Sequence, residues 1–237
     1  MYDVIILGAT YLGAGLAQYY KKKCMVVEAS HRAGYEFHGT LREFPEYQPK
    51  HKAACQLQKM LIEKPGIHES HPAIYPWFQD CQILFGTRVA DIQKEEAGFS
   101  CTLHGSRGFE TYRAKAVIDT RCSDSMCESK TYNFLIESPT LPHFPGTVCT
   151  ETSVPNRYLV ACPLPPDCDF PTARQAMAAV MAQFAPEQRL ILSASVFAYT
   201  LKAGYPKKEK GILYFPSVLR KTPAEAMDMG LQMGGSL

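Results

Sequence analysis

The residues with the clearest chemical meaning form a glycine-containing turn near the start of the chain. Gly8-Ala9-Thr10-Tyr11-Leu12-Gly13 has glycine at the first and third glycine positions of the pattern Gly-x-Gly-x-x-Gly, and Thr10 at the second. Glu28 follows 20 residues after Gly8. Such a turn lets the backbone approach a pyrophosphate, and an acid at that distance binds the ribose hydroxyls of a dinucleotide. The pattern therefore indicates dinucleotide binding, and the acid disfavours a 2′-phosphate and hence NADP.

Two strands and a helix are needed to position this turn, and the hydrophobic pattern predicts them. Val4-Ile5-Ile6-Leu7 is a continuous apolar run, typical of a strand buried on both faces of a parallel sheet. A helical pattern runs from Tyr11 to Lys23, where three lysines complement the helix dipole. Met25-Val26-Val27 predicts a second strand that ends at Glu28. The first thirty residues thus form a β-turn-α-β unit with a right-handed connection.

Later segments carry a resemblance to a known family. Ala29-Ser30-His31-Arg32-Ala33-Gly34-Tyr35 is similar to a family loop that ends in Gly-Gly, with tyrosine in place of the second glycine. Within Ile83 to Ile92, Val89 stands where the family has a valine whose backbone faces adenine. Phe99 to Leu103 and Gly108 to Tyr112 predict an antiparallel hairpin, which matches the family's β-meander.

The resemblance continues toward the C-terminus. Thr111 to Thr120 is similar to the strand before the family's Ala-Thr-Gly-Asp motif, although Thr120-Arg121-Cys122-Ser123-Asp124 replaces that motif. Gly211 to Ser217 is similar to the last strand, and the sequence from Thr222 predicts a capped helix start. Over residues 1–40, 80–125 and 211–237 the chain resembles glutathione-reductase-like, two-dinucleotide-binding flavoproteins and, more narrowly, FAD-dependent oxidoreductases.

This resemblance implies FAD as the cofactor, and the flavin would then carry the redox chemistry. The turn would hold the pyrophosphate, Glu28 the ribose and Val89 the adenine, with Thr120-Arg121 on the far side. No catalytic acid or base can be named from the sequence, and no metal is expected. The expected cofactor-binding residues are Gly8, Thr10, Tyr11, Leu12, Gly13, Glu28, Ala29, Ser30, Gly34, Val89, Thr120 and Arg121.

The sequence between the segments that resemble the family predicts a separate α+β region. Tyr158 to Cys162 indicates a strand stopped by Pro163, and a helix is expected from an N-cap at Thr172 to Phe184. Leu190 to Leu192 and Val196 to Tyr199 indicate further strands. The expected fold class is α/β: a Rossmann-like FAD/NAD(P)-binding domain with a parallel central sheet, a β-meander and a small antiparallel α+β insertion. Residues 1–128 and 206–237 would form the FAD-binding domain, and residues 129–205 a substrate or cap region.

Composition narrows the class further. The 237 residues are 46% hydrophobic and 20% charged with a net charge of +2, which excludes a disordered chain. The short basic runs Lys21–Lys23 and Lys207–Lys210 are interpreted as a helix end and a solvated loop, so no nucleic-acid partner is expected. No apolar stretch approaches the roughly 18 residues of a membrane span. Nine irregularly spaced cysteines favour reduced thiols and a cytoplasmic location.

The segment after the second strand is less informative. Ala53 to Glu63 predicts a helix that ends at Pro65-Gly66. Five of the seven histidines lie between His31 and His71, and His68 and His71 have helical spacing. Because a third ligand is not evident, exposed loop histidines are preferred over a metal site.

Three functions remain open, of which an FAD-binding oxidoreductase acting on an unidentified small molecule is favoured. The Thr10 hydroxyl could donate to a phosphate oxygen, or the side chain could block the site. Likewise, Arg121 could neutralise a pyrophosphate or fill its place. Blocked positions would favour a non-catalytic Rossmann-like scaffold or subunit that has lost FAD and acts through protein–protein contacts. An NAD-dependent enzyme fits only the first thirty residues. Because the insertion is short, a second copy or a partner subunit could complete the site.

Overall fold

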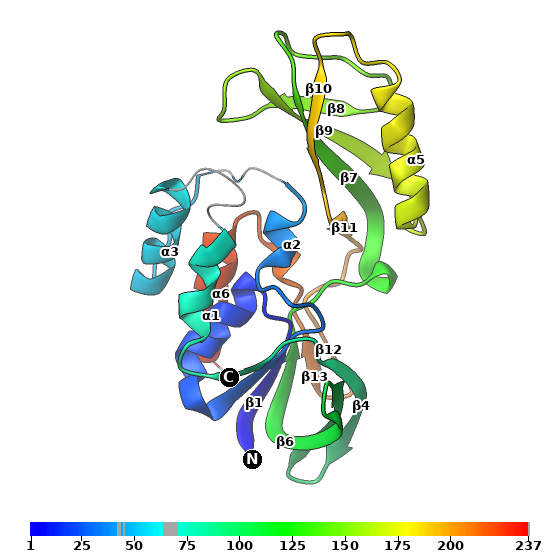
Figure 1. The fold of residues 1–237 in the computed structure, drawn as a ribbon. Helices are drawn as coiled ribbons and strands as arrows, with labels where there is room; N and C mark the ends of the chain where they lie inside the picture. Colours follow the sequence, from blue (N-terminus) through cyan, green and yellow to red (C-terminus); the bar gives the residue numbers. More distant parts are fainter. Residues whose placement is uncertain (42–43, 45, 64–70, 237) are drawn as a thin grey trace. The chain divides into compact units, whose positions relative to one another are not determined.

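The chain divides into two compact units, each with its own sheet. The computed structural model describes residues 1–41, 44, 46–63 and 71–236 (Figure 1). The first unit comprises Met1–Gly34, Pro45–Arg121 and Gly204–Leu237, and the second comprises Tyr35–Phe44 and Cys122–Ala203. The second unit thus overlaps the 129–205 region and includes a short segment from near residue 40.

The sheet of the first unit has a parallel centre. Its strands follow the order β12-β13-β6-β1-β2-β3, and β1, β2, β3, β6 and β13 run parallel to their central neighbours. β4 and β5 pair antiparallel and continue onto β6 as a meander. The strands are β1 (Tyr2–Leu7), β2 (Cys24–Val27), β3 (Gln82–Leu84), β4 (Arg88–Glu95), β5 (Gly98–Gly105), β6 (Gly108–Asp119), β12 (Lys207–Glu209) and β13 (Ile212–Tyr214). The expected Rossmann-like fold class is confirmed.

The apolar run predicted as the first strand lies at the centre of this sheet. Val4 to Leu7 are all fully or almost fully buried, and β1 lies between β2 and β6 within the sheet. Ile5 and Leu7 pack in one core with residues of β2 and of the meander, among them Met25, Val27 and Leu103. Burial on both faces explains why the run is continuous rather than alternating.

The long strand β6 joins two structures that the sequence suggested separately. Its first half pairs with β5 as the expected hairpin, with His104 opposite Phe109. Its second half pairs in parallel with β1, with Ile6 opposite Ile118 and Leu7 opposite Asp119. The meander therefore leads directly into the centre of the parallel sheet.

The first lysine run lies at the end of a helix, as expected, whereas the second is not a loop. α1 (Tyr11–Tyr20) ends before the lysines, and Lys21–Lys23 form a 3-10 turn, η1, that begins at a positive φ of 51° at Lys21. Lys207–Glu209 form the exposed edge strand β12 instead of a loop. Lysines on an edge strand discourage pairing with other chains, so their charge suits this position.

The helix α6 (Pro223–Gly234) begins as expected. The Thr222 side chain caps it by accepting a hydrogen bond from the Glu225 backbone N–H at 3.0 Å. The Glu225 carboxylate in turn accepts from the Lys221 N–H at 2.8 Å. α6 packs closely against α1 (Figure 1), because a Cβ on Gly15 would lie 2.1 Å from the Met227 carbonyl oxygen.

The second unit is the expected small antiparallel α+β piece. Its sheet has the order β10-β7-β9-β8, with β11 also paired to β7. The strands β7 (Cys127–Glu137) and β9 (Arg157–Leu164) form its centre, and the helix α5 (Phe170–Met181) belongs to the same unit. Its remaining elements are α2 (Tyr35–His38), η3 (Asp124–Met126), β8 (Val148–Glu151), β10 (Arg189–Ser193) and β11 (Ala198–Leu201).

Two boundaries in this unit differ from the sequence prediction. α5 is capped by Asp169, whose carboxylate accepts from the Thr172 N–H at 2.9 Å, so Thr172 is inside the helix. β9 continues through Pro163 to Leu164. β8 pairs with β9 only as far as Ala161, so the proline lies where the strand has a free edge and its missing N–H is tolerated.

The segment after β2 contains the expected helix α3 (Lys52–Glu63), with Ala54 and Leu57 buried. The 3-10 segment η2 (His71–Phe78) leads to β3, and a further turn, η4 (Ser217–Leu219), precedes α6. Pro65-Gly66 and His68 lie outside the described residues. The expectation of exposed histidines is wrong for His38, which is buried. Within the described part of the chain, none of the helices has the length and apolar character needed to cross a lipid bilayer.

Candidate dinucleotide site

The turn after β1 has the backbone that its two glycines suggest. Gly8 has a φ of 102°, and its N–H donates to the Val27 carbonyl oxygen at 2.8 Å, which ties the turn to β2. A Cβ on Gly13 would lie 2.6 Å from the Gly8 carbonyl oxygen. Position 8 therefore requires glycine for its positive φ, and position 13 requires glycine because α1 packs closely on the turn.

Thr10 acts as the N-cap of α1. Its hydroxyl oxygen accepts from the Gly13 N–H at 3.0 Å, and the hydroxyl donates to the Thr120 hydroxyl oxygen at 2.7 Å. The Leu12 N–H donates to the Ser217 hydroxyl oxygen at 3.3 Å. Amides at the start of α1, which attract anions at a free helix N-terminus, thus have partners within the protein.

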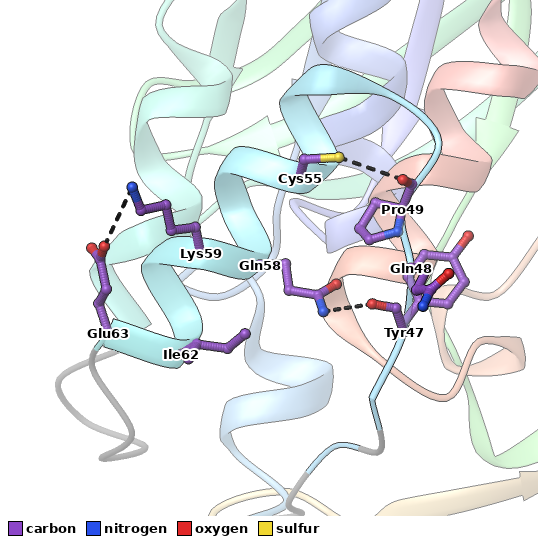
Figure 2. A pocket seen from close by; sticks show the side chains of 8 residues that line it. All are labelled: Tyr47, Gln48, Pro49, Cys55, Gln58, Lys59, Ile62 and Glu63. Carbon is purple, nitrogen blue, oxygen red and sulfur yellow. Dashed lines mark hydrogen bonds and ion pairs between the residues drawn. The ribbon is translucent and has the colours of Figure 1, made fainter.

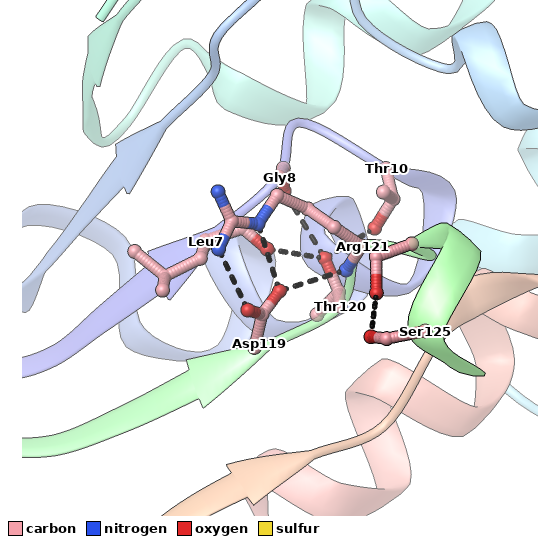
Figure 3. A network of polar contacts seen from close by, with 8 residues as sticks. Leu7, Gly8, Thr10, Asp119, Thr120, Arg121 and Ser125 are labelled. Atoms are coloured by element: carbon pink, nitrogen blue, oxygen red, sulfur yellow. Dashed lines mark hydrogen bonds and ion pairs between the residues drawn. The ribbon is translucent and has the colours of Figure 1, made fainter. Parts of the chain in front are cut away.

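Arg121 lies over the turn and forms an ion pair with Asp119 (Figure 3). The Arg121 Nε donates to Asp119 Oδ1 at 2.9 Å and Nη2 donates to Oδ2 at 2.7 Å, a bidentate arrangement. Burial acts to lower the pKa of Arg121, but the hydrogen bonds and charge of Asp119 raise it above its ordinary value. The Arg121 side chain is packed on Gly8, since a Cβ there would lie 2.7 Å from Arg121 Cγ.

Glu28 is held beside the same turn at the carboxyl end of β2. Its carboxylate accepts hydrogen bonds from the Ala9 N–H at 2.9 Å and the Ser30 N–H at 2.7 Å. Its backbone is also fixed, because its N–H donates to Leu84 and its carbonyl oxygen accepts from Thr87. A carboxylate has about four lone-pair sites, so two hydrogen bonds leave acceptor capacity for ribose hydroxyls.

The loop after Glu28 folds back on the turn. Gly34 has a φ of 68°, and its N–H donates to the Ala9 carbonyl oxygen at 2.7 Å. Its missing side chain leaves room for the ring of Tyr11, which is fully buried like Leu12. Tyr11 and Leu12 can therefore face a ligand only through their backbones. Ala29 and Ser30 lie in this same loop.

Val89 lies near the start of β4 and pairs with Leu103. Its half-buried side chain packs against the core of the sheet. Thr87, two residues earlier, donates its N–H to the Glu28 carbonyl oxygen at 3.0 Å, so this strand begins next to the acid. The structure thus brings the expected residues of the first unit to one edge of the parallel sheet, where the strands have their carboxyl ends.

Two residues of this region were missed in the sequence. Ser217 is fully buried, and its N–H donates to the Thr120 carbonyl oxygen at 2.8 Å while its hydroxyl accepts from α1. Asp119 falls within the strand predicted from Thr111 to Thr120 and was not expected to pair with Arg121. An acid two residues before an arginine was the available signal for this pair, whereas nothing local marked Ser217.

A groove lies elsewhere in the first unit, and none of the expected cofactor-binding residues lines it (Figure 2). It has a volume of about 610 Å³ and lies between α3 and the segment before it. Its lining residues are Tyr47, Gln48, Pro49, Cys55, Gln58, Lys59, Ile62 and Glu63. No group of three or more His, Cys, Asp or Glu side chains within the described ranges could hold a metal ion.

Comparison with known proteins found relatives by structure only. Neither the protein-family models nor the curated proteins gave a match. Among solved structures, p-nitrophenol 4-monooxygenase from Pseudomonas putida DLL-E4 is 12% identical with a TM-score of 0.62, over 99% of this chain and 77% of that one. A flavoprotein/dehydrogenase from Cytophaga hutchinsonii is 12% identical with a TM-score of 0.60, over 99% and 77%. Aklavinone-11 hydroxylase, solved with FAD and aklavinone, is 13% identical with a TM-score of 0.57, over 99% and 61%.

These similarities show that the chain shares its fold with these structures. At identities of 10 to 14% they show the fold alone. The chain spans only 60 to 62% of the length of several of these structures. The resemblance to glutathione-reductase-like proteins is not confirmed by the neighbours described above, which include hydroxylases and a monooxygenase.

Proposed function

We propose that this chain is an FAD-binding oxidoreductase that acts on a small-molecule substrate. The observation that carries the proposal is the Glu28 carboxylate, fixed by the Ala9 and Ser30 N–H groups beside the Gly8 turn. This is where a dinucleotide-binding sheet needs an acceptor for ribose hydroxyls. Support also comes from the fold, since a structural neighbour was solved with FAD bound.

The residues present fit FAD. Glu28 retains acceptor capacity for the ribose, and the backbone around Gly8 and Gly13 would face the pyrophosphate. Arg121 places a cation on Gly8, and its pairing with Asp119 uses Nε and Nη2, so Nη1 lies outside that pair. Val89 would present its backbone to the adenine. When bound, the flavin supplies the hydride or electron chemistry, and the chain supplies position and charge.

Glu28→Ala tests the site directly. Loss of hydrogen bonds to a charged group costs about 1.5–3 kcal/mol, so we expect FAD affinity to fall roughly 10- to 100-fold. Purified protein is first examined for a flavin absorption spectrum, and released chromophore is identified by mass. FAD binding to the apoprotein is then measured by fluorescence quenching. Glu95→Ala is the matched control, because Glu95 lies on β4 and pairs with Arg113 at 3.3 Å. Unchanged affinity of Glu28→Ala would contradict the assignment.

A second candidate, a scaffold that has lost FAD and acts through protein contacts, is favoured by the polar contacts at the turn. The Thr10 and Ser217 hydroxyl oxygens accept hydrogen bonds from N–H groups at the start of α1, and the Arg121 side chain packs on Gly8. The double variant Thr10→Gly/Arg121→Gly distinguishes the two functions. A working site should keep or lose FAD affinity, because the Arg121 cation is removed. A scaffold with blocked positions should instead gain measurable FAD binding. Circular dichroism confirms that the variant is folded.

We also propose that the second unit contributes to substrate selection. We further propose that a second copy or a partner subunit completes the site and that the protein is cytoplasmic. Size-exclusion chromatography with light scattering tests the oligomeric state.

A further inference from the structure

Two cysteines of the parallel sheet lie opposite each other on neighbouring strands. β2 and β3 pair in parallel with Met25 opposite Gln82, so the preceding residues, Cys24 and Cys81, stand side by side at the start of these strands. Neighbouring strands are about 4.8 Å apart, and a disulfide spans Cα atoms that are about 4.4–6.8 Å apart. The Cys24 thiol donates to the Lys21 carbonyl oxygen at 3.2 Å, and the Cys81 thiol donates to the Phe78 carbonyl oxygen at 3.3 Å. The register therefore places the Cα atoms of Cys24 and Cys81 within the range that a disulfide spans.

The two thiols differ in exposure and acidity. Cys24 is fully buried, whereas Cys81 is partly exposed. The neighbouring Cys24 thiol lowers the pKa of Cys81 below its ordinary value, although burial and the charge of Asp80 oppose this shift. The Cys81 thiol and burial together raise the pKa of Cys24. Cys81 is thus the accessible nucleophile, and Cys24 is the resolving thiol next to it.

We propose that Cys24 and Cys81 form a dithiol site that a low-molecular-weight disulfide, such as glutathione disulfide, oxidises to a protein disulfide. The Cys81 thiolate attacks one sulfur of glutathione disulfide, and one glutathione thiolate leaves. Cys24 then loses its proton and attacks the Cys81 sulfur of the mixed disulfide, and the second glutathione thiolate leaves. Two protein thiols are oxidised by two electrons, and glutathione disulfide is reduced to two thiols that take up the two protons.

The other thiols provide an internal comparison. Cys101 and Cys162 are buried, and burial raises the pKa of each thiol to about 11. Cys149 lies opposite Val160 on the neighbouring strand, which places it diagonally from Cys162 rather than directly opposite. Diagonal residues on paired strands are about 7–8 Å apart, too far for a disulfide without movement. The proposed site therefore combines proximity with an accessible, acidified thiol.

The dithiol site is separate from the candidate dinucleotide site. Cys24 is the first residue of β2, and Glu28 follows the last residue of the same strand. The two sites thus lie at opposite ends of β2, and the proposal does not depend on FAD binding.

The test is peptide mapping of the full chain after equilibration in glutathione buffers of increasing oxidation. After acid quenching and alkylation, trypsin releases residues 24–32 and 60–88, each of which contains one cysteine. We expect a disulfide-linked pair of these peptides that becomes the main oxidised product and disappears after reduction. Cys24→Ser should instead accumulate glutathione on Cys81. Cys55→Ser, which removes an exposed thiol outside the pair, should leave the linked peptides unchanged.

Two results would overturn the proposal. One is glutathione on Cys55 without any linked peptide from Cys24 and Cys81 in the folded wild-type chain. The other is a linked peptide that forms only after denaturation, because the folded sheet would then not hold the thiols in reach. Since both results come from the wild-type chain, the test stands even if a cysteine variant fails to fold.

Discussion

At the scale of single residues, polar side chains act through partners that are distant in the sequence. Thr10 caps α1 and also donates to Thr120, a residue 110 positions away. Asp228 on α6 accepts hydrogen bonds from the Tyr47 hydroxyl and the Lys50 and His51 N–H groups. The buried oxygens of Thr10 and Asp228 thus have hydrogen-bond partners within the protein, which is the condition for burying them at low cost.

Asp228 leads to a pH-dependent prediction. Its burial acts to raise its pKa, but the backbone N–H groups of Lys50 and His51 and the His51 and Tyr47 side chains together lower it below the ordinary value. A carboxylate with a lowered pKa stabilises the fold above its unfolded pKa of about 4, and this contribution is lost as the pH falls toward the folded pKa. We expect Asp228→Asn to lower the free energy of unfolding by about 1–3 kcal/mol at pH 7.

The difference between wild type and Asp228→Asn should shrink as the pH falls from 5 toward 2. Urea unfolding at several pH values measures it. Asp91→Asn is a suitable control, since Asp91 lies on the exposed strand β4. A difference that stays constant with pH would show that the Asp228 charge does not contribute to stability.

At the scale of elements, the contact between α1 and α6 depends on two small residues. A Cβ on Gly15 would lie 2.1 Å from the Met227 carbonyl oxygen, and one on Gly230 would lie 2.2 Å from the Leu12 carbonyl oxygen. Both obstacles are backbone atoms, which cannot rotate away as a side chain can. The helices must therefore separate to accept any larger residue.

Gly15→Ala tests this packing against intrinsic helix propensity. Propensity alone predicts that alanine stabilises a helix interior by about 1 kcal/mol relative to glycine. Overpacking against fixed backbone predicts a net destabilisation of about 1–3 kcal/mol, and we expect that outcome in thermal or urea unfolding. Gly235→Ala is the matched control, because the nearest atom to its added Cβ is 3.6 Å away. A stabilised Gly15→Ala variant would show that the helices are not in close contact.

At the scale of the whole molecule, the two units have separate cores. The core of the first unit contains Ile5, Met25 and Phe99, and that of the second contains Phe134, Ile136 and Val160. The second unit also buries a cation, Lys130, whose ammonium donates to the Cys168 carbonyl oxygen at 2.7 Å. The same ammonium lies 4.8 Å from the centre of the Phe197 ring.

Lys130→Met tests whether the units respond independently. It keeps much of the apolar stem but leaves the Cys168 carbonyl without its donor, so we expect a loss of about 1–3 kcal/mol. The ion pair between Lys130 and Asp124 adds little to this loss of stability, because Asp124 is well exposed to solvent. Hydrogen exchange should accelerate in β7 and β9 while β1 and β2 keep their protection. Lys202→Met, which removes an exposed donor to Ser125, should change little. Uniform acceleration in both sheets would instead indicate one cooperative unit.

The sequence by itself determined the parts of this protein that depend on neighbouring residues. The β1-turn-α1-β2 unit, the meander hairpin and the capped start of α6 follow from apolar periodicity, glycine and capping residues, which act within a few positions. Gly8, Gly13 and Glu28 could be named for the same reason. The wider fold was expected from the resemblance of these and later segments to a known family.

Only the tertiary structure decided which distant groups meet. It directs the Thr10 hydroxyl to Thr120, turns the Lys207–Glu209 run into an edge strand, and places Cys24 beside Cys81. It also requires glycine at positions 15 and 230, where no local pattern demands it. These outcomes depend on strand register and helix packing, which are set by the whole core, so residues far apart in the sequence cannot be paired from their local patterns.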